Sequence, residues 1–255
     1  MAEQRKHILA SSPYKHVRDA TYDLAVLPWA ATEAHNYHLP YGTDIIETDR
    51  IASEAGRLAS EKGARVVILP TVPFGVNTGQ MDIPLTINMN PGTKVSVLDD
   101  VATSLERHGI GKLLLLNGHG GNDFKQMIRE LKLRHTLFIC TANWYTCVDA
   151  KLFFKEPGDH AGEMETSLMM YLAPELVLPL SEAGSGGQRR MKIRAFQEGW
   201  AWTPREWLKV TTDTGTGDPR AASAEKGEKY FQAVTAKIAD FLVEVASADA
   251  EDLYE

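Results

Sequence analysis

Short, mostly apolar segments alternate along this chain with longer stretches in which apolar residues recur at helical spacing. The apolar segments are residues 24–27, 65–69, 112–116 and 137–140. Amphipathic stretches follow the first three, beginning at Thr43 or Thr48, just before Val97, and at Phe124. Strands that are apolar at nearly every position are buried on both faces, and strands that alternate with helices form parallel sheets. The pattern therefore predicts an α/β fold, in which helices cover both faces of a mainly parallel sheet.

The C-terminal half contains two further predicted helices and one long stretch without apolar periodicity. One helix is expected over about residues 161–172, ending before Pro174, and the other over about residues 221–246. Residues 180–220 contain two glycine clusters and favour a loop. Long loops in compact domains are often functional, so a functional role for this segment is expected. No repeat or linker-like change in composition interrupts the chain, which predicts one domain over residues 1–255.

Charge and cysteine content narrow the range of partners. The net charge of -7 argues against nucleic acid or an anionic membrane as the main partner. The only cysteines, Cys140 and Cys147, form no CxxC pattern and favour free thiols in a reducing cytoplasm. No apolar run is long enough to cross a membrane, and the N-terminal segment has no signal-peptide pattern. We therefore expect a cytoplasmic protein without a membrane or nucleic-acid partner.

Three polar clusters contain the residue types that bind transition metals. The first follows the first predicted strand and consists of Glu33, His35, His38 and Asp44. In an extended segment Glu33 and His35 point to the same side, and loops at the carboxyl ends of strands line the ligand crevice of an open α/β sheet. Carboxylate oxygen and imidazole nitrogen are ligands for zinc, manganese or iron. A polar loop with surface histidines is the alternative that this cluster leaves open.

The second cluster is the sequence NGHGGN at residues 117–122, directly after a predicted strand. Glycines on both sides of His119 allow a sharp turn and leave the imidazole unobstructed. A phosphate-binding loop is disfavoured because neither GxGxxG nor GxxxxGK[ST] occurs. The alternative is a turn with an incidental histidine, but this loop should open at the same edge of the sheet as the first cluster.

The third cluster is the sequence DHAGEMETS at residues 159–167, where a helix is predicted to begin. If the first turn is helical, His160 and Glu163 share a face and Glu165 points elsewhere. The alternative is that Asp159 caps the helix and Glu163 complements its dipole. Together the clusters contain enough ligands for two adjacent metal ions that share an aspartate. Such ions lower the pKa of bound water and polarise a carbonyl, and a nearby histidine can protonate a leaving nitrogen.

The chain resembles the creatininase (creatinine amidohydrolase) family in four motifs that occur in the family's order: ExHxxHLPxGTD, NGHGGN, DHAGExETS and GxGDPRxAxxEKG. The resemblance extends from about Leu24 to Gly227 and implies a three-layer α/β/α fold. It also implies two divalent metal ions, zinc or manganese with iron as an alternative, and a homohexamer. By the same resemblance, Glu33, Asp44 and His119 hold one metal, and His35, Asp44 and a further carboxylate hold the other. His160 matches the family's proton-transfer histidine.

The chain departs from the family's pattern at several positions. Creatininase proper has a metal-binding glutamate where this chain has Gly121, and Glu163 is our candidate for the missing carboxylate. The NGHGGN sequence looks like other branches of the family, which include deformylases and peptide-processing enzymes as well as cyclic-amide hydrolases. Asn36 stands where the family commonly has glycine, and residues 77–81 lack its usual histidine near the substrate. These departures argue against creatinine as the substrate, but not against the metal chemistry.

We therefore expect a metal-dependent amidohydrolase that opens a C–N bond in a small cyclic or linear amide by attack of metal-bound hydroxide. The alternatives are hydrolysis of another bond at the same centre, such as a formamide, a peptide end or a cyclic ketone, and a non-catalytic assembly subunit. The catalytic candidates are His160 and Glu163. The candidates for substrate contact are His38, Gly120, Gly121, Trp144 and Tyr145. For Trp144 and Tyr145, which follow the fourth predicted strand, a place in the core is an equal alternative. The basic residues between Arg189 and Arg194 are a weaker candidate for binding a substrate carboxylate or phosphate; the alternatives are a solvated face and a subunit contact.

Overall fold

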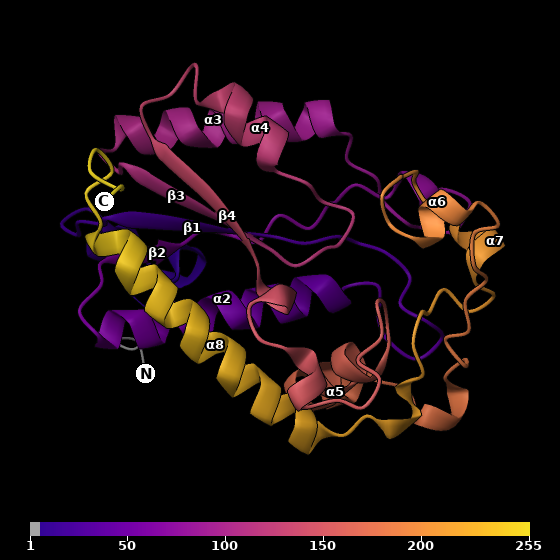
Figure 1. The fold of residues 1–255 in the computed structure, drawn as a ribbon. Helices are drawn as coiled ribbons and strands as arrows, with labels where there is room; N and C mark the ends of the chain where they lie inside the picture. The colour runs from indigo at the N-terminus through magenta and orange to yellow at the C-terminus, as the bar shows by residue number, and fades with distance from the viewer. Residues whose placement is uncertain (1–5) are drawn as a thin grey trace.

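A four-stranded parallel sheet lies between two layers of helices in the computed structural model, which describes residues 6–255 (Figure 1). Its strands are β1 (Leu24–Trp29), β2 (Val66–Ile68), β3 (Lys112–Asn117) and β4 (Phe138–Asn143), in the order β2-β1-β3-β4. This arrangement confirms the predicted three-layer α/β/α fold. Residues 1–5 belong to the N-terminal segment in which we expect no signal peptide, and they lie outside the described residues.

Each face of the sheet has its own apolar core, because successive strand residues point to opposite faces. Leu24 and Val26 of β1 pack against α2 (Thr43–Glu61) and α8 (Ala224–Ser247). Ala25 and Leu27 pack on the other face against α3 (Pro91–Arg107) and α4 (Lys125–Leu131). All residues of β1 are buried, as expected for a central strand covered on both sides. The two cores hold the carboxyl ends of β1 and β3 side by side.

Two boundaries differ from the prediction for local reasons. Strand β1 continues through Pro28 to Trp29. Proline has no N–H to donate to a neighbouring strand. It is tolerated here because its backbone faces the side on which β2 has already ended, and its carbonyl accepts a hydrogen bond from Val72 N there. Helix α5 (Glu163–Leu172) begins two residues later than expected, because Ala161 adopts a left-handed φ of 50° that a right-handed helix cannot include.

Most of the segment between α5 and α8 is irregular, as its composition predicted. It contains α6 (Arg194–Gln197) and α7 (Trp207–Val210), which lie beside each other at one end of the molecule (Figure 1). The remaining short helices are α1 (Tyr14–Val17), η2 (Leu9–Ser11), η3 (Thr78–Gln80), η4 (Trp144–Thr146), η5 (Ala150–Leu152), η6 (Pro174–Leu176), η7 (Leu180–Glu182) and η8 (Pro219–Ala221). Among residues 6–255, no helix combines the length and the apolar character that crossing a bilayer requires.

An ion-pair cluster around His135 ties the segment before β4 to α3. His135 Nδ1 lies 2.8 Å from a Glu106 carboxylate oxygen, and its Nε2 lies 2.8 Å from Asp99. The Glu106 carboxylate also accepts the backbone N–H groups of Thr136 and Leu137. The hydrogen bond to Glu106, although opposed by burial, raises the pKa of His135 above its ordinary value.

We expect His135→Gln to lower the free energy of unfolding by about 1–2 kcal/mol at about pH 6, since it removes charge-assisted hydrogen bonds. A histidine whose folded-state pKa is raised stabilises fully below its unfolded pKa and loses that contribution as pH rises through the folded value. The difference between the wild type and the variant should therefore shrink as the pH rises. Denaturant unfolding of both proteins across neutral and alkaline pH measures it, and a difference that stays constant with pH would contradict the assignment.

Candidate metal centre

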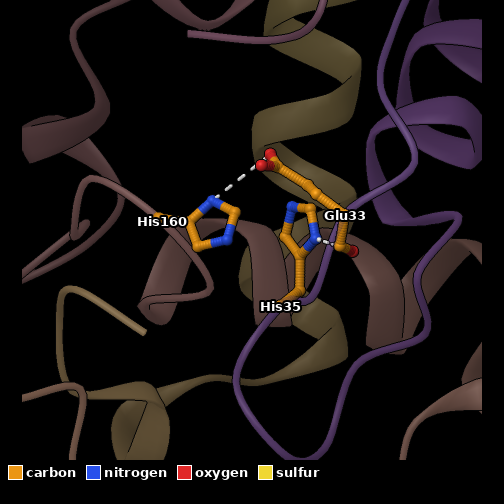
Figure 2. A group of neighbouring side chains, drawn as sticks. All are labelled: Glu33, His35 and His160. Carbon is orange, nitrogen blue, oxygen red and sulfur yellow. Dashed lines mark hydrogen bonds and ion pairs between the residues drawn. The ribbon is translucent and has the colours of Figure 1, made fainter. Parts of the chain in front are cut away.

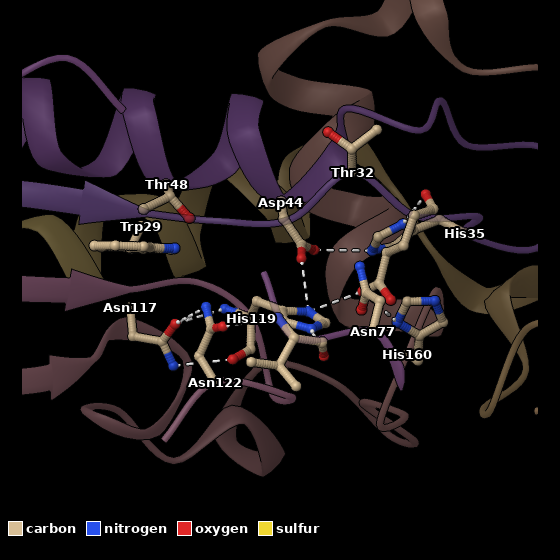
Figure 3. A network of polar contacts seen from close by, with 12 residues as sticks. Trp29, Thr32, His35, Asp44, Thr48, Asn77, Asn117, His119, Asn122 and His160 are labelled. Carbon is tan, nitrogen blue, oxygen red and sulfur yellow. Dashed lines mark hydrogen bonds and ion pairs between the residues drawn. The ribbon is translucent and has the colours of Figure 1, made fainter. Parts of the chain in front are cut away.

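Six ionisable side chains from separate parts of the chain converge at the carboxyl edge of the sheet. Figure 3 shows four of them, His35, Asp44, His119 and His160. Their positions follow from the elements that carry them. Glu33 and His35 follow β1, Asp44 lies in the first turn of α2, His119 follows β3, and His160 and Glu165 lie just before and within α5. All but Glu165 are buried. Within the described residues they form three overlapping groups whose ligand atoms lie within 4.8 Å of one another.

The first group consists of Glu33, Asp44 and His119. His119 Nδ1 lies 2.9 Å from Glu33 Oε1 and 3.0 Å from Asp44 Oδ2. The other ring nitrogen, Nε2, is 3.1 Å from the Val76 carbonyl, to which it donates when it carries the proton. In that tautomer the Nδ1 lone pair faces two carboxylate oxygens, an arrangement that a cation between them would stabilise.

The second group consists of His35, Asp44 and Glu165. His35 Nε2 lies 2.9 Å from Asp44 Oδ1, and His35 Nδ1 lies 3.1 Å from the carbonyl of Glu33. Asp44 thus directs Oδ1 toward His35 and Oδ2 toward His119. In the described part of the chain, Oδ2 has no hydrogen-bond partner of good geometry. One carboxylate facing two ligand groups is the geometry of a bridging ligand.

His160 lies beside Glu33 and His35 (Figure 2). Its Nε2 lies 2.8 Å from the Ala34 carbonyl, and its Nδ1 lies 3.8 Å from Glu33 Oε1. The ring packs between His35, at 4.1 Å between centroids, and Trp207, at 4.8 Å. With Nε2 held by a backbone carbonyl, Nδ1 is the atom that His160 offers to the cluster and the cavity.

The donor set fits divalent transition metals. Each of the three histidines directs one ring nitrogen to a backbone carbonyl and the other toward carboxylates, which is typical of histidines that ligate metals. Burial alone would lower the pKa of His35, but the Asp44 carboxylate outweighs it and raises that pKa to about 10. Glu33 and Asp44 likewise overcome burial and raise the pKa of His119. A site that attracts protons this strongly also attracts metal cations, and imidazole and carboxylate suit zinc and manganese.

Glu163, our candidate for the missing carboxylate, does not lie in the cluster. Its carboxylate accepts hydrogen bonds of 3.0 Å from the backbone N–H groups of Lys155 and Glu156, and it pairs with Lys226. The predicted shared face with His160 is wrong, because α5 begins at Glu163 and His160 lies outside it, bridged to Thr216. Glu165 occupies the position expected of Glu163.

Two departures from the family's pattern have structural reasons. A Cβ at Gly121 would overlap the Val76 carbonyl oxygen and His119 Nε2, so a glutamate there would disrupt the contact that orients His119. Asn36 adopts a left-handed φ of 54°, which asparagine tolerates better than most residues. Its side-chain amide also exchanges two hydrogen bonds with the backbone of Gly184, at 2.8 and 3.2 Å. These bonds attach the long irregular segment to the first cluster.

A cavity of about 470 Å³ opens above the cluster. Of the residues predicted to contact substrate, Gly120, Gly121 and Tyr145 line it. His38 and Trp144 are not among the lining residues. His38 is buried with Nε2 2.9 Å from Thr166 Oγ1, and Trp144 is buried in the α2 and α8 core with Nε1 donating to Thr48. Both residues lie close in sequence to other predicted site residues, but their rings point into the protein.

Other lining residues were not predicted individually. The long irregular segment contributes Trp202, Arg205 and Trp207, and the turn around η3 contributes Asn77 and Gln80. The Arg205 guanidinium stacks on Trp207 at 5.6 Å from the ring centroid. The basic residues between Arg189 and Arg194 are exposed and do not line the cavity. For Asn77 and Gln80 the sequence signal was the resemblance, which places residues 77–81 near the substrate. For Trp202, Arg205 and Trp207 it was the length of the loop, which does not indicate which of its residues point inward.

Sequence comparisons relate the chain to hydrolases. The family model described as creatinine amidohydrolase matches residues 10–242. The mycofactocin precursor peptide peptidase of Mycobacterium ulcerans is 26% identical over 83% of this chain and 81% of its own length. The creatinine amidohydrolase of Pseudomonas putida is 27% identical over 60% and 65%. The 3-dehydro-scyllo-inosose hydrolase of Thermotoga maritima is 28% identical over 61% and 52%.

Solved structures share the whole fold. A Bacteroides fragilis protein whose name refers to creatinine amidohydrolase superposes with a TM-score of 0.92 and 45% identity, over 98% of this chain and 99% of its own. A manganese form of creatininase superposes with a TM-score of 0.78 over 95% and 99%, and a Zn-Zn form of a creatininase mutant with 0.76 over 94% and 98%, each at 21% identity. With the family model covering most of its length, the chain belongs to the creatininase family of hydrolases.

Proposed function

We propose that this protein hydrolyses a C–N bond in a small cyclic or linear amide at two divalent metal ions. The observation that carries the proposal is Asp44, whose two oxygens face the two ligand groups. Glu33, Asp44 and His119 would hold one ion, and His35, Asp44 and Glu165 the other. Zinc and manganese suit this donor set, and creatininase structures with each of them are known. Bound there, the ions would polarise a carbonyl and lower the pKa of water.

The side chains around the ligands would orient and protonate the substrate. His160 is the candidate proton donor to the leaving nitrogen, since Nδ1 faces the cluster while the Ala34 carbonyl restrains Nε2. Trp207 packs against the His160 ring and limits its rotation. The backbone of Gly120 and Gly121 lines the cavity without side chains, so a carbonyl group can approach the ligands closely.

Removal of a residue from a peptide end is the second candidate function. The cavity of about 470 Å³ falls in the range that encloses drug-sized ligands, so it has room for more than a single small ring. The relative from Mycobacterium ulcerans is named as a peptide peptidase and aligns over 81% of its length. Both candidates require the same ligands and the same proton donor, and they differ in what fills the rest of the cavity. A panel of cyclic amides, formamides and short peptides separates them by kcat/KM.

The experiment that tests the centre compares Glu165→Gln with Glu163→Gln. We expect about two transition-metal ions per wild-type chain and about one in Glu165→Gln, because an amide is a weaker ligand than a carboxylate. Glu163→Gln should keep both ions, since its carboxylate bonds to the backbone and to Lys226. Plasma mass spectrometry of protein purified without added metal gives the counts. Loss of metal in Glu163→Gln with retention in Glu165→Gln would reverse the assignment.

A further inference from the structure

Lys94 of α3 is fully buried although it carries a charged group. Its Nζ donates to Asn122 Oδ1 at 2.7 Å and lies 4.0 Å from the centroid of the Phe124 ring and 5.2 Å from that of Trp29. Among residues 6–255 its polar partner is this neutral amide; the Asp123 carboxylate acts on it electrostatically without forming an ion pair, which is unusual for a buried lysine. Burial lowers the pKa of Lys94 to about 7, so holding the cation here is unfavourable. A lysine that is buried despite this unfavourable free energy is expected to have a specific structural or functional role.

Asn122, the partner of Lys94, is a junction of the NGHGGN loop (Figure 3). Its Oδ1 also accepts the backbone N–H of Val76 at 3.2 Å, and its Nδ2 donates to Asn117 Oδ1 at 3.0 Å. Asn117 in turn bonds to both backbone groups of His119: Oδ1 accepts His119 N at 3.1 Å, and Nδ2 donates to His119 O at 2.9 Å. The backbone of His119 is therefore held through Asn117 and Asn122.

The His119 ring is held through the same junction. Its Nε2 lies 3.1 Å from the carbonyl of Val76, and the N–H of Val76 is bonded to Asn122. Two donors, Lys94 Nζ and Val76 N, converge on Asn122 Oδ1 and determine which end of the amide faces them. Without Lys94 the amide could turn over, which would place its NH₂ group against the N–H of Val76. The aromatic rings stabilise the cation without adding a carboxylate that could compete for the metals.

We propose that Lys94 is a positioning residue for the metal centre: through Asn122 it orients the His119 imidazole toward Glu33 and Asp44. It touches neither substrate nor ligand atoms and acts only through the loop. The proposal rests on the proposed function in one respect, that His119 is a metal ligand.

Lys94→Met tests the proposal because it keeps a long, flexible apolar side chain and removes only the donor. We expect the affinity for one of the two metal ions to fall about tenfold or more, as for other residues that orient ligands, with the second less affected. Competition with a chelator measures both affinities. Leu98→Met, one helical turn along α3 and equally buried, has no polar contact to lose and should retain wild-type affinities.

A second readout needs no metal. In nitrogen-15 spectra of the histidine rings, metal-free wild type should show a protected Nε2 proton on His119, and Lys94→Met should lose that protection. If both the metal affinities and the His119 signal of Lys94→Met match the wild type, the proposal is overturned. If the wild type binds no metal but the His119 signal still changes, the proposed function fails and the positioning role of Lys94 stands.

A second variant covers the case in which Lys94→Met does not fold. Asn122→Ala removes the acceptor of Lys94 Nζ and of Val76 N, together with the N–H donated to Asn117, while Lys94 is kept. It should show the same loss of protection in the His119 signal, because the contact through which Lys94 acts is gone. An unchanged His119 signal in Asn122→Ala would overturn the proposal.

Discussion

Asp44→Ala is expected to abolish binding of both metal ions and, with it, measurable hydrolysis. The reason is geometric, since Asp44 Oδ1 lies 2.9 Å from His35 Nε2 and Oδ2 lies 3.0 Å from His119 Nδ1. Removing the carboxylate takes one charged ligand from each group at once, whereas loss of any other ligand weakens one group more than the other. Metal analysis of purified protein, followed by titration with zinc or manganese, measures the effect.

Asp49→Ala is the matched control for this prediction. Asp49 lies on the same helix, but it is exposed and bonds to Thr71 at 2.9 Å, away from the cluster. It should retain both ions and wild-type turnover. If Asp44→Ala kept two full equivalents, Asp44 would not bridge the ions, and the two ligand groups would have to be assigned independently.

His160→Ala is expected to leave metal binding near normal and to lower kcat by about 100-fold or more, as for the loss of a general acid. His160 Nδ1 is 3.8 Å from Glu33 Oε1, farther than the 2.9 Å between His119 Nδ1 and the same oxygen. The longer distance favours a proton-transfer role over ligation. Steady-state kinetics on an amide substrate together with metal counts measures both quantities.

His38→Gln is the control, because His38 is a buried histidine close to the cluster that does not line the cavity. Glutamine can keep the hydrogen bond to Thr166 Oγ1, so turnover should stay near the wild-type value. An unchanged kcat in His160→Ala would remove His160 from the mechanism. Loss of one metal ion would instead favour the group formed by Glu33, His35 and His160 as a binding site.

Local patterns in the sequence were enough to predict the sheet and the edge at which the polar clusters meet. Residues 24–27 and 113–116 are apolar at every position, as they must be in strands covered on both faces, so periodicity alone indicated a parallel α/β sheet. Because parallel strands end at the same edge, Glu33, His35 and His119 could be expected near one another without coordinates. Both arguments depend only on residues close together in the chain.

Only the tertiary structure decided which glutamate joins the cluster and which residues line the cavity. The left-handed backbone at Ala161 delays the start of α5 by two residues, so the pairing of His160 with Glu163 does not form and Glu165 meets His35 instead. The i, i+3 relation that places two side chains on one face holds only where both residues are helical, so a helix that begins at Glu163 does not set the direction of His160. Trp202 and Arg205 reach the cavity because the long segment folds back over η3, whereas Trp144 turns into the core. Such contacts join residues far apart in the chain, and no local pattern determines them.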